Sequence, residues 1–231
     1  MSSQTVPTPG ASPASVLIVD DHELARAGLA SMLTGEPDLH VVGEAENGEA
    51  AVAVCALLQP DLVLMDVRMP GMDGLAATAA IKARSPHTSV VIVTLYEEQD
   101  DLLRAIRAGA AGYVLKDATR RDLLGTVRRV LTGEAALEPA MAMRLLRRLS
   151  RDGVSAGSTE VEPLTPRQIE VLRLLVEGHT NQEIANDLGI GQGTVKSHVE
   201  HIIAKLGASD RTQAAVRAVQ RGLIVPAALD P

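Results

Sequence analysis

The first half of the chain alternates short apolar runs with longer stretches in which apolar residues recur at helical spacing. Runs rich in Val, Ile and Leu predict strands at residues 16–20, 40–45, 62–66, 90–94 and 112–116. Helical spacing predicts helices at about 23–34, 48–58, 74–84, 98–108 and 119–132, and Asn47-Gly48 and Asp73-Gly74 are turn or cap signals at the starts of two of them. Because the strand runs are apolar almost without alternation, we expect strands buried on both faces of a parallel sheet. Five such strand–helix units predict a doubly wound α/β domain.

The pattern changes after residue 133. The run MAMRLLRRLSR could form a short helix, and the Gly- and Ser-containing segment after it is typical of a linker. From Leu164 onward there is only helical periodicity, interrupted at Gly178, Gly189 and Gly207, which predicts a small all-α domain. We therefore divide the chain into a disordered tail (1–14), an α/β domain (15–133), a linker (134–162) and a helical domain (163–231).

Composition narrows the class of protein. The single cysteine, Cys55, lies in an apolar run, so we interpret it as a core residue and expect no intramolecular disulfide. The first fifteen residues lack the basic and apolar segments of a signal peptide, and no apolar run reaches the roughly 20 residues that span a bilayer. These features predict a cytoplasmic protein without a membrane partner. The net charge is −7, and residues 163–231 contain seven basic and seven acidic residues, so overall charge gives no support to nucleic-acid binding.

Polar residues stand where the predicted strands end. They are Asp20 and Asp21 after the first strand, Asp66 at the third, Thr94 at the fourth and Lys116 at the fifth. Because ligands of parallel α/β sheets bind at the carboxyl ends of strands, we expect these side chains to converge. Crowded carboxylates favour a bound cation, and oxygen ligands favour Mg²⁺. A central carboxylate can attack phosphorus to give an acyl phosphate, while a lysine and a hydroxyl contact the phosphoryl oxygens.

The blocks VLIVDDH, LVLMDVRMPGMDG, VVIVT and GYVLKD resemble the signature blocks of response-regulator receiver domains over roughly residues 15–133. The resemblance implies a flavodoxin-like fold with a five-stranded parallel sheet and phosphorylation of Asp66 by a sensor histidine kinase. It also implies a magnesium site made by Asp20, Asp21, Asp66 and the backbone carbonyl of Arg68.

The same resemblance assigns further roles at the strand ends. Lys116 would contact the phosphoryl group, and Thr94 and Tyr113 would form a switch pair in which the hydroxyl moves toward phosphate and the ring turns inward. Tyr96, two residues beyond Thr94, would either gate the site or be a surface aromatic residue.

Two alternatives use some of the same residues. Haloacid-dehalogenase-type phosphatases need a second aspartate two residues after the nucleophile, and this chain has Arg68 there. We therefore expect a regulator rather than an enzyme that turns over an external substrate. The second alternative is a transcription factor that works without phosphorylation and uses the α/β domain to bind a ligand or partner. The full set of acidic, threonine and lysine positions makes it the weaker interpretation.

The helical part predicts a helix-turn-helix. Thr165 caps a first helix that has Pro166 in its first turn and Gln168 three residues after the cap, and this helix ends at Gly178. A second helix is predicted at 181–188 and a third at 194–206. The apolar residues of the third helix share one face, at Val195, Val199, Ile202, Ile203 and Leu206.

The opposite face of the third helix is polar, as in a recognition helix that enters the major groove. Lys196 can donate to guanine and Glu200 can accept from cytosine, with Ser197 on the same face. Residues better suited to phosphate contacts are Thr194, Asn181, Gln182, Lys205 and Arg211.

The block from Leu164 to about Ile224 resembles the helix-turn-helix of the LuxR/NarL (FixJ) type, most closely at TVKSHV and KLG. The resemblance implies binding to double-stranded DNA and a homodimer, formed when phosphorylated, through residues 212–224. Two positions depart from the family pattern: Gly191 replaces a common helix-capping serine, and Glu200 stands where basic or neutral residues are common. The remaining alternative is a helical interaction domain whose polar face is only solvated.

Overall fold

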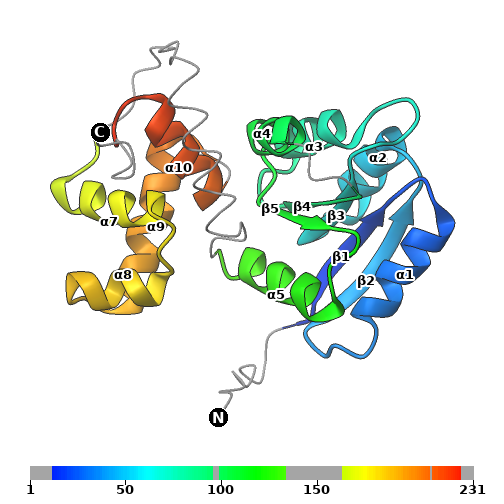
Figure 1. Ribbon diagram of the computed structural model, residues 1–231, viewed down its shortest axis with the longest axis horizontal. Coiled ribbons are helices and arrows are strands. Elements are labelled where there is room, and N and C mark those ends of the chain that lie inside the picture. The colour runs from blue at the N-terminus through cyan, green and yellow to red at the C-terminus, as the bar shows by residue number, and fades with distance from the viewer. Residues whose placement is uncertain (1–11, 96–98, 134–162, 209, 225–231) are drawn as a thin grey trace.

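A five-stranded parallel sheet forms the centre of the α/β part (Figure 1). The computed structural model describes residues 12–95, 99–133, 163–208 and 210–224. The strands are β1 (Ala14–Val19), β2 (Leu39–Ala45), β3 (Leu62–Asp66), β4 (Ser89–Thr94) and β5 (Gly112–Leu115). Their spatial order is β2-β1-β3-β4-β5, and every neighbouring pair is parallel. The order reverses between β1 and β3, so the crevice for a ligand lies beyond the carboxyl ends of these two strands.

Two helical layers bury both faces of this sheet. The helices are α1 (Glu23–Leu33), α2 (Gly48–Leu58), α3 (Gly74–Arg84), α4 (Gln99–Ala108) and α5 (Arg120–Leu131). Side chains of α2, α3 and α4 belong to one hydrophobic core, and side chains of α1 and α5 belong to a second. Strand β1 shows why its sequence does not alternate: Leu17 contributes to the first core and Ile18 to the second, and both are fully buried.

The predicted elements of the α/β domain are confirmed, with differences of up to two residues at their ends. Asn47 and Asp73, at two of the expected turns, cap α2 and α3 by accepting backbone hydrogen bonds from Ala50 and Ala76. The predicted short helix in 134–162 and residue Tyr96 lie outside the described residues.

The helical part contains α7 (Pro166–Val176), α8 (Asn181–Leu188), α9 (Gln192–Leu206) and α10 (Arg211–Gln220). Thr165 and Gln168 form the predicted capping box, with Pro166 as the first residue of α7. Helix α9 begins two residues before the expected Thr194. Its N-cap is Gly191, which has no side chain to accept a capping hydrogen bond. The apolar face of α9 packs with α7, α8 and α10 in a third core.

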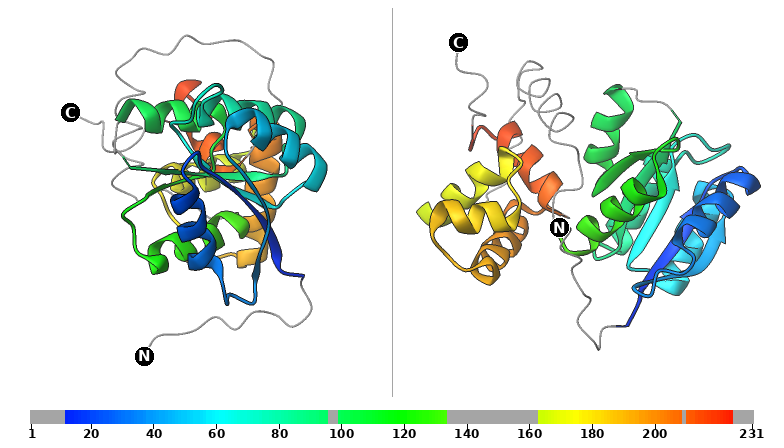
Figure 2. Two further views of the ribbon diagram at one scale, coloured as in Figure 1. Left: turned by 90° about the vertical axis from the view of Figure 1, so that its right-hand side faces the viewer. Right: turned by 60° about the horizontal axis from the view of Figure 1, so that its bottom comes forward.

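Helix α10 also contacts the α/β part. It is the helix of its domain that lies nearest to the α/β domain in Figures 1 and 2, and it packs against α4. Val216 of α10 is 4% exposed and belongs to the same hydrophobic cluster as Leu102 and Leu103 of α4. The two parts are therefore joined by an apolar contact as well as by the chain.

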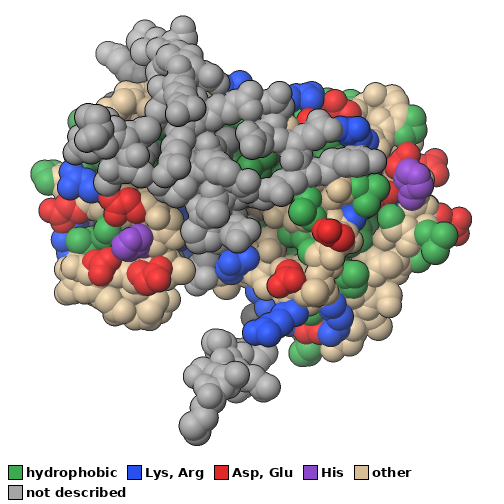
Figure 3. All heavy atoms as spheres, in the orientation of Figure 1, with side chains coloured by type: hydrophobic (Ala, Val, Ile, Leu, Met, Phe, Trp, Pro, Cys, Tyr) green, Lys and Arg blue, Asp and Glu red, His purple; other side chains and the backbone are tan. Residues whose placement is uncertain are grey.

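Charged side chains of both signs lie on the described parts of the face in Figure 3. Among the described residues, no helix has both the length and the apolar character needed to cross a membrane.

Candidate functional site

Two buried aspartates and a lysine meet at the carboxyl end of the sheet. Asp20 follows β1 and is fully buried, and Asp66 is the last residue of β3 and is 5% exposed. Lys116, the residue after β5, places its Nζ 2.6 Å from Asp20 Oδ2 and 3.2 Å from Asp66 Oδ1. The three side chains come from strands that end at the same edge, so the expected convergence of these residues is present.

Burial and charge act in opposite directions on this cluster. Burial raises the pKa of Asp66, the positive charge of Lys116 lowers it, and the negative charge of Asp20 raises it again; the net direction is upward. Burial by itself would lower the pKa of Lys116, but its close contact with Asp20 and the charge of Asp66 raise it above its usual value. Lys116 therefore stays protonated and holds the two carboxylates together.

The donor set beside this cluster suits a hard divalent cation. Ligand atoms of Asp20, Asp21 and His22 lie within 4.8 Å of one another. Asp20 Oδ1 accepts the backbone N–H of His22, whereas its buried Oδ2 has an ammonium neighbour but no hydrogen bond of good geometry. A buried carboxylate oxygen in this state can still bind a cation. The residues present fit Mg²⁺, with His22 as a neighbour that the sequence had not indicated.

The loop from β3 to α3 is held tightly against Asp66. Gly74 donates its N–H to the carbonyl of Val67 at 2.9 Å. A Cβ built on Gly74 would lie 1.8 Å from the carbonyl oxygen of Asp66. Only glycine fits at this position without movement of the strand end. The sequence marked Asp73 and Gly74 as a cap, but it gave no signal for this contact.

Thr94 and Tyr113 lie on adjacent strands near the cluster. Thr94 ends β4, is 2% exposed and accepts the backbone N–H of Lys116 at 2.7 Å through its carbonyl. Tyr113 on β5 is 7% exposed and belongs to the core that contains α4. The ring of Tyr113 therefore already lies in the core in this structure, which is the inward position predicted for the phosphorylated state.

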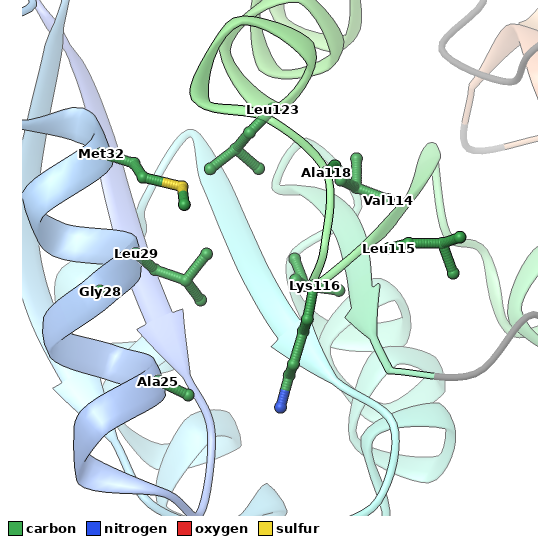
Figure 4. Close-up of a pocket in the computed structure, with 10 residues that line it drawn as sticks. Ala25, Gly28, Leu29, Met32, Val114, Leu115, Lys116, Ala118 and Leu123 are labelled. Atoms are coloured by element: carbon green, nitrogen blue, oxygen red, sulfur yellow. The ribbon is translucent and has the colours of Figure 1, made fainter.

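A small apolar cavity of about 140 Å³ lies beside the cluster, between α1 and α5. Figure 4 shows Lys116 at one end of it, with the ammonium nitrogen directed away from Met32 and Leu123. Gly28 of α1 lines the cavity, and a Cβ there would meet no atom within 4 Å.

The polar face of α9 is open to solvent. Thr194, Lys196, Ser197 and Glu200 are exposed, and Lys205 is partly exposed with its Nζ donating to the carbonyl of Pro163 at 3.0 Å. Gln182 on α8 is also exposed.

Two residues expected at phosphates are buried instead. Arg211 is 3% exposed and donates from Nη1 to Asn181 Oδ1 at 3.0 Å and from Nη2 to the carbonyl of His179 at 2.7 Å. Asn181 is 6% exposed. Their placement does not fit direct contact with a phosphate, because both side chains join α10 to the start of α8 inside the domain.

Comparisons with known proteins cover both parts of the chain. Residues 16–128 match the family model described as response regulator receiver domain, and residues 162–218 match bacterial regulatory proteins of the luxR family. The chain is 41% identical to the transcriptional regulatory protein LiaR of Bacillus subtilis and 40% identical to the response regulator protein VraR of Staphylococcus aureus. Each alignment covers 90% of this chain and 98% of the relative.

A solved structure gives the same result. A two-component response regulator of the LuxR family from an Aurantimonas species is 31% identical, with a TM-score of 0.55, over 59% of this chain and 98% of that one. The relatives are regulators and not enzymes. The acidic cluster, the helix-turn-helix and these matches together show that the chain belongs to the two-component response regulators with a receiver domain and a LuxR-type DNA-binding domain, which are transcriptional regulators.

Proposed function

We propose that Asp66 accepts a phosphoryl group from a sensor histidine kinase and that this modification controls DNA binding. The observation that carries the proposal is the contact of Lys116 Nζ with both Asp20 and Asp66, because it places a cation and a second carboxylate beside a buried potential nucleophile. An Asp66 carboxylate oxygen attacks phosphorus, the bond from phosphorus to the histidine nitrogen of the kinase breaks, and the electron pair leaves with the imidazole. The product is an acyl phosphate.

Asp20, Asp21, Asp66 and the backbone carbonyl of Arg68 would hold Mg²⁺ in this reaction. When bound, Mg²⁺ supplies positive charge that offsets the repulsion between the carboxylates and the incoming phosphoryl oxygens. Lys116 contributes a second cation. Its ammonium group lies between Asp20 and Asp66, so it can exchange its contact with one of these carboxylates for a contact with a phosphoryl oxygen.

The signal would leave the site through Thr94 and Tyr113. The Thr94 hydroxyl donates to the phosphoryl group, and Tyr113 adjusts its packing in the core that it shares with α4. Helix α4 contacts α10, so a shift of this surface loosens the contact between the two domains. The freed α10 would then pair with α10 of a second copy to form a homodimer.

DNA contact is proposed for the exposed polar residues of the helix-turn-helix. Lys196, Ser197 and Glu200 face the base edges, and Thr194, Gln182 and Lys205 contact phosphates. Asn181 and Arg211 support the domain from inside, because they bond to each other. A homodimer would present two such helices to two half-sites of double-stranded DNA in the cytoplasm.

The test is the intact mass of the protein after incubation with Mg²⁺ and a small-molecule phosphodonor such as acetyl phosphate. Wild type is expected to gain one phosphoryl group, Asp66→Asn none, and the exposed Asp117→Asn one, as a matched aspartate control. An adduct on Asp66→Asn would assign the chemistry to another residue. If no phosphoryl adduct forms with either acetyl phosphate or a phosphorylated histidine kinase, the phosphorylation-independent transcription factor becomes the better description.

A further inference from the structure

Four charged residues of alternating sign connect the loop that follows Asp66 to helix α4. Arg68 Nη2 lies 3.9 Å from Asp101 Oδ2 on α4. Arg104, one turn further along α4, places Nη1 3.4 Å from Asp101 Oδ1 and Nη2 3.7 Å from Asp73 Oδ2. Arg68 and Asp73 belong to the β3–α3 loop. The row of four charges therefore begins and ends on this loop, and its two middle members lie on α4.

Asp101 is the member whose environment demands a partner. Its side chain is 10% exposed, whereas the side chains of Arg68 and Arg104 are 55% and 58% exposed. A carboxylate removed from water is unfavourable unless cations lie close to it. Among the described residues, the cations beside Asp101 are Arg104 from its own helix and Arg68 from the loop, two residues after Asp66. The loop that carries Arg68 therefore contributes to how α4 is held, beside the apolar packing of α4 in the core.

Both ends of this connection lead to functional parts of the molecule. The loop is fixed to the phosphorylation site, since Gly74 lies against the carbonyl of Asp66 and Asp73 caps α3. On the other side, Leu102 and Leu103 follow Asp101 in sequence and share a hydrophobic cluster with Val216 of α10. A change in the pairing of Asp101 can thus reach the contact between α4 and the DNA-binding domain.

We propose that Arg68 and Asp101 are positioning residues that hold α4, and through it α10, in the resting arrangement, and that the phosphoryl group on Asp66 competes with Asp101 for Arg68. This inference rests on the proposed phosphorylation of Asp66. A phosphoryl group adds close to two negative charges. Arg68 is the arginine nearest to Asp66 in the sequence, and its side chain is 55% exposed. Once Arg68 turns toward the phosphoryl oxygens, Asp101 keeps Arg104 as its partner among the described residues. The remaining ion pair between α4 and the loop is then Arg104 with Asp73, so α4 is held less firmly.

The test removes the charge of Asp101 without changing its shape. In the full-length, unphosphorylated protein, Asp101→Asn should increase affinity for a DNA duplex selected by wild type from a random-sequence pool by about fivefold, the lower end of usual coupling between sites. Backbone hydrogen exchange in α10 should become faster in the same sample. After treatment with acetyl phosphate, the affinities of the variant and of wild type should be equal.

Three further variants separate the pairing from a general effect on folding. Arg68→Gln should have the same effect as Asp101→Asn, and the double variant should add nothing, because both changes remove one interaction. Arg68→Lys should restore most of the resting behaviour. Arg107 is an exposed arginine of α4 that is not one of the four charged residues. Arg107→Gln is therefore the matched control and should equal wild type in resting DNA affinity and in hydrogen exchange of α10.

The outcomes distinguish this inference from the function on which it rests. If wild type gains the phosphoryl group and responds to it, while Asp101→Asn matches wild type in resting affinity and in hydrogen exchange, the coupling is absent and the inference is overturned. If wild type gains no phosphoryl group at all, the proposed function fails first. The hydrogen exchange of α10 in the unphosphorylated variants then still shows whether Asp101 holds α4.

Discussion

Replacing Gly74 with alanine tests the closeness of α3 to the strand that carries Asp66. The added Cβ would lie 1.8 Å from the carbonyl oxygen of Asp66 and 2.8 Å from its carbonyl carbon. Ordinary contacts between a methyl carbon and an oxygen are longer by well over 1 Å, so either the strand end or the start of α3 must move. The two atoms that the added Cβ would meet both belong to the backbone of Asp66, so no rotation of a side chain can relieve the clash.

The expected cost is at the upper end for an inserted methyl group. Overpacking typically lowers the free energy of unfolding by about 1–3 kcal/mol. Because this clash involves backbone, we expect Gly74→Ala to lower the free energy of unfolding of the receiver domain by about 3 kcal/mol or more. The displaced carbonyl belongs to the proposed phosphoacceptor, so Gly74→Ala should also lose most of its phosphoryl adduct. Urea unfolding followed by circular dichroism measures the first effect, and intact mass measures the second.

Gly28→Ala is the matched control, since Gly28 also lies in a helix but faces an open cavity. A Cβ there meets nothing within 4 Å, so the substitution should stabilise the receiver by about 0.5–1 kcal/mol through the helix preference of alanine. The two glycine-to-alanine changes should therefore have opposite signs. Equal stability of Gly74→Ala and wild type would show that α3 does not approach Asp66 as closely as described.

Three other predictions address charge and DNA contact. Lys116→Met leaves Asp20 and Asp66 without their shared cation and should destabilise the metal-free receiver by about 3 kcal/mol, with partial recovery on adding Mg²⁺. A thermal melt with and without Mg²⁺ measures this effect. An unchanged melting temperature would contradict the ion cluster. Arg128 holds the pKa of Asp38 below its usual value through a hydrogen bond, so the stabilisation is present at neutral pH and is lost as pH falls through the lowered pKa. Arg128→Gln should therefore lower stability by up to about 1 kcal/mol at pH 7 and by nothing in strong acid, and a difference independent of pH would rule out this pair as the cause. Lys196→Ala should weaken specific DNA binding by about tenfold or more, measured by footprinting, whereas an unchanged footprint would mean that α9 is not the recognition helix.

The local pattern of the sequence determined most of the secondary structure and the type of chemistry. Apolar runs without alternation predicted strands that are buried on both faces, and residues 16–19 of β1 are fully buried in this way. Capping residues such as Thr165 and Asp73 act within three or four residues, so their roles were visible in the sequence alone. Carboxylates at strand ends indicated the site because parallel strands bring their carboxyl ends to one edge.

Contacts between residues far apart in the chain were decided by the tertiary structure. Polarity suggested that Arg211 and Asn181 face DNA, but the packing of α10 against α8 buries them against each other. Nothing local connects Arg68 with Asp101 or reveals that Gly74 lies against Asp66, because these distances depend on how loops and helices pack on the ordered sheet. Periodicity fixes which face of an element is apolar, whereas the partner of a polar side chain is fixed only when the elements are assembled.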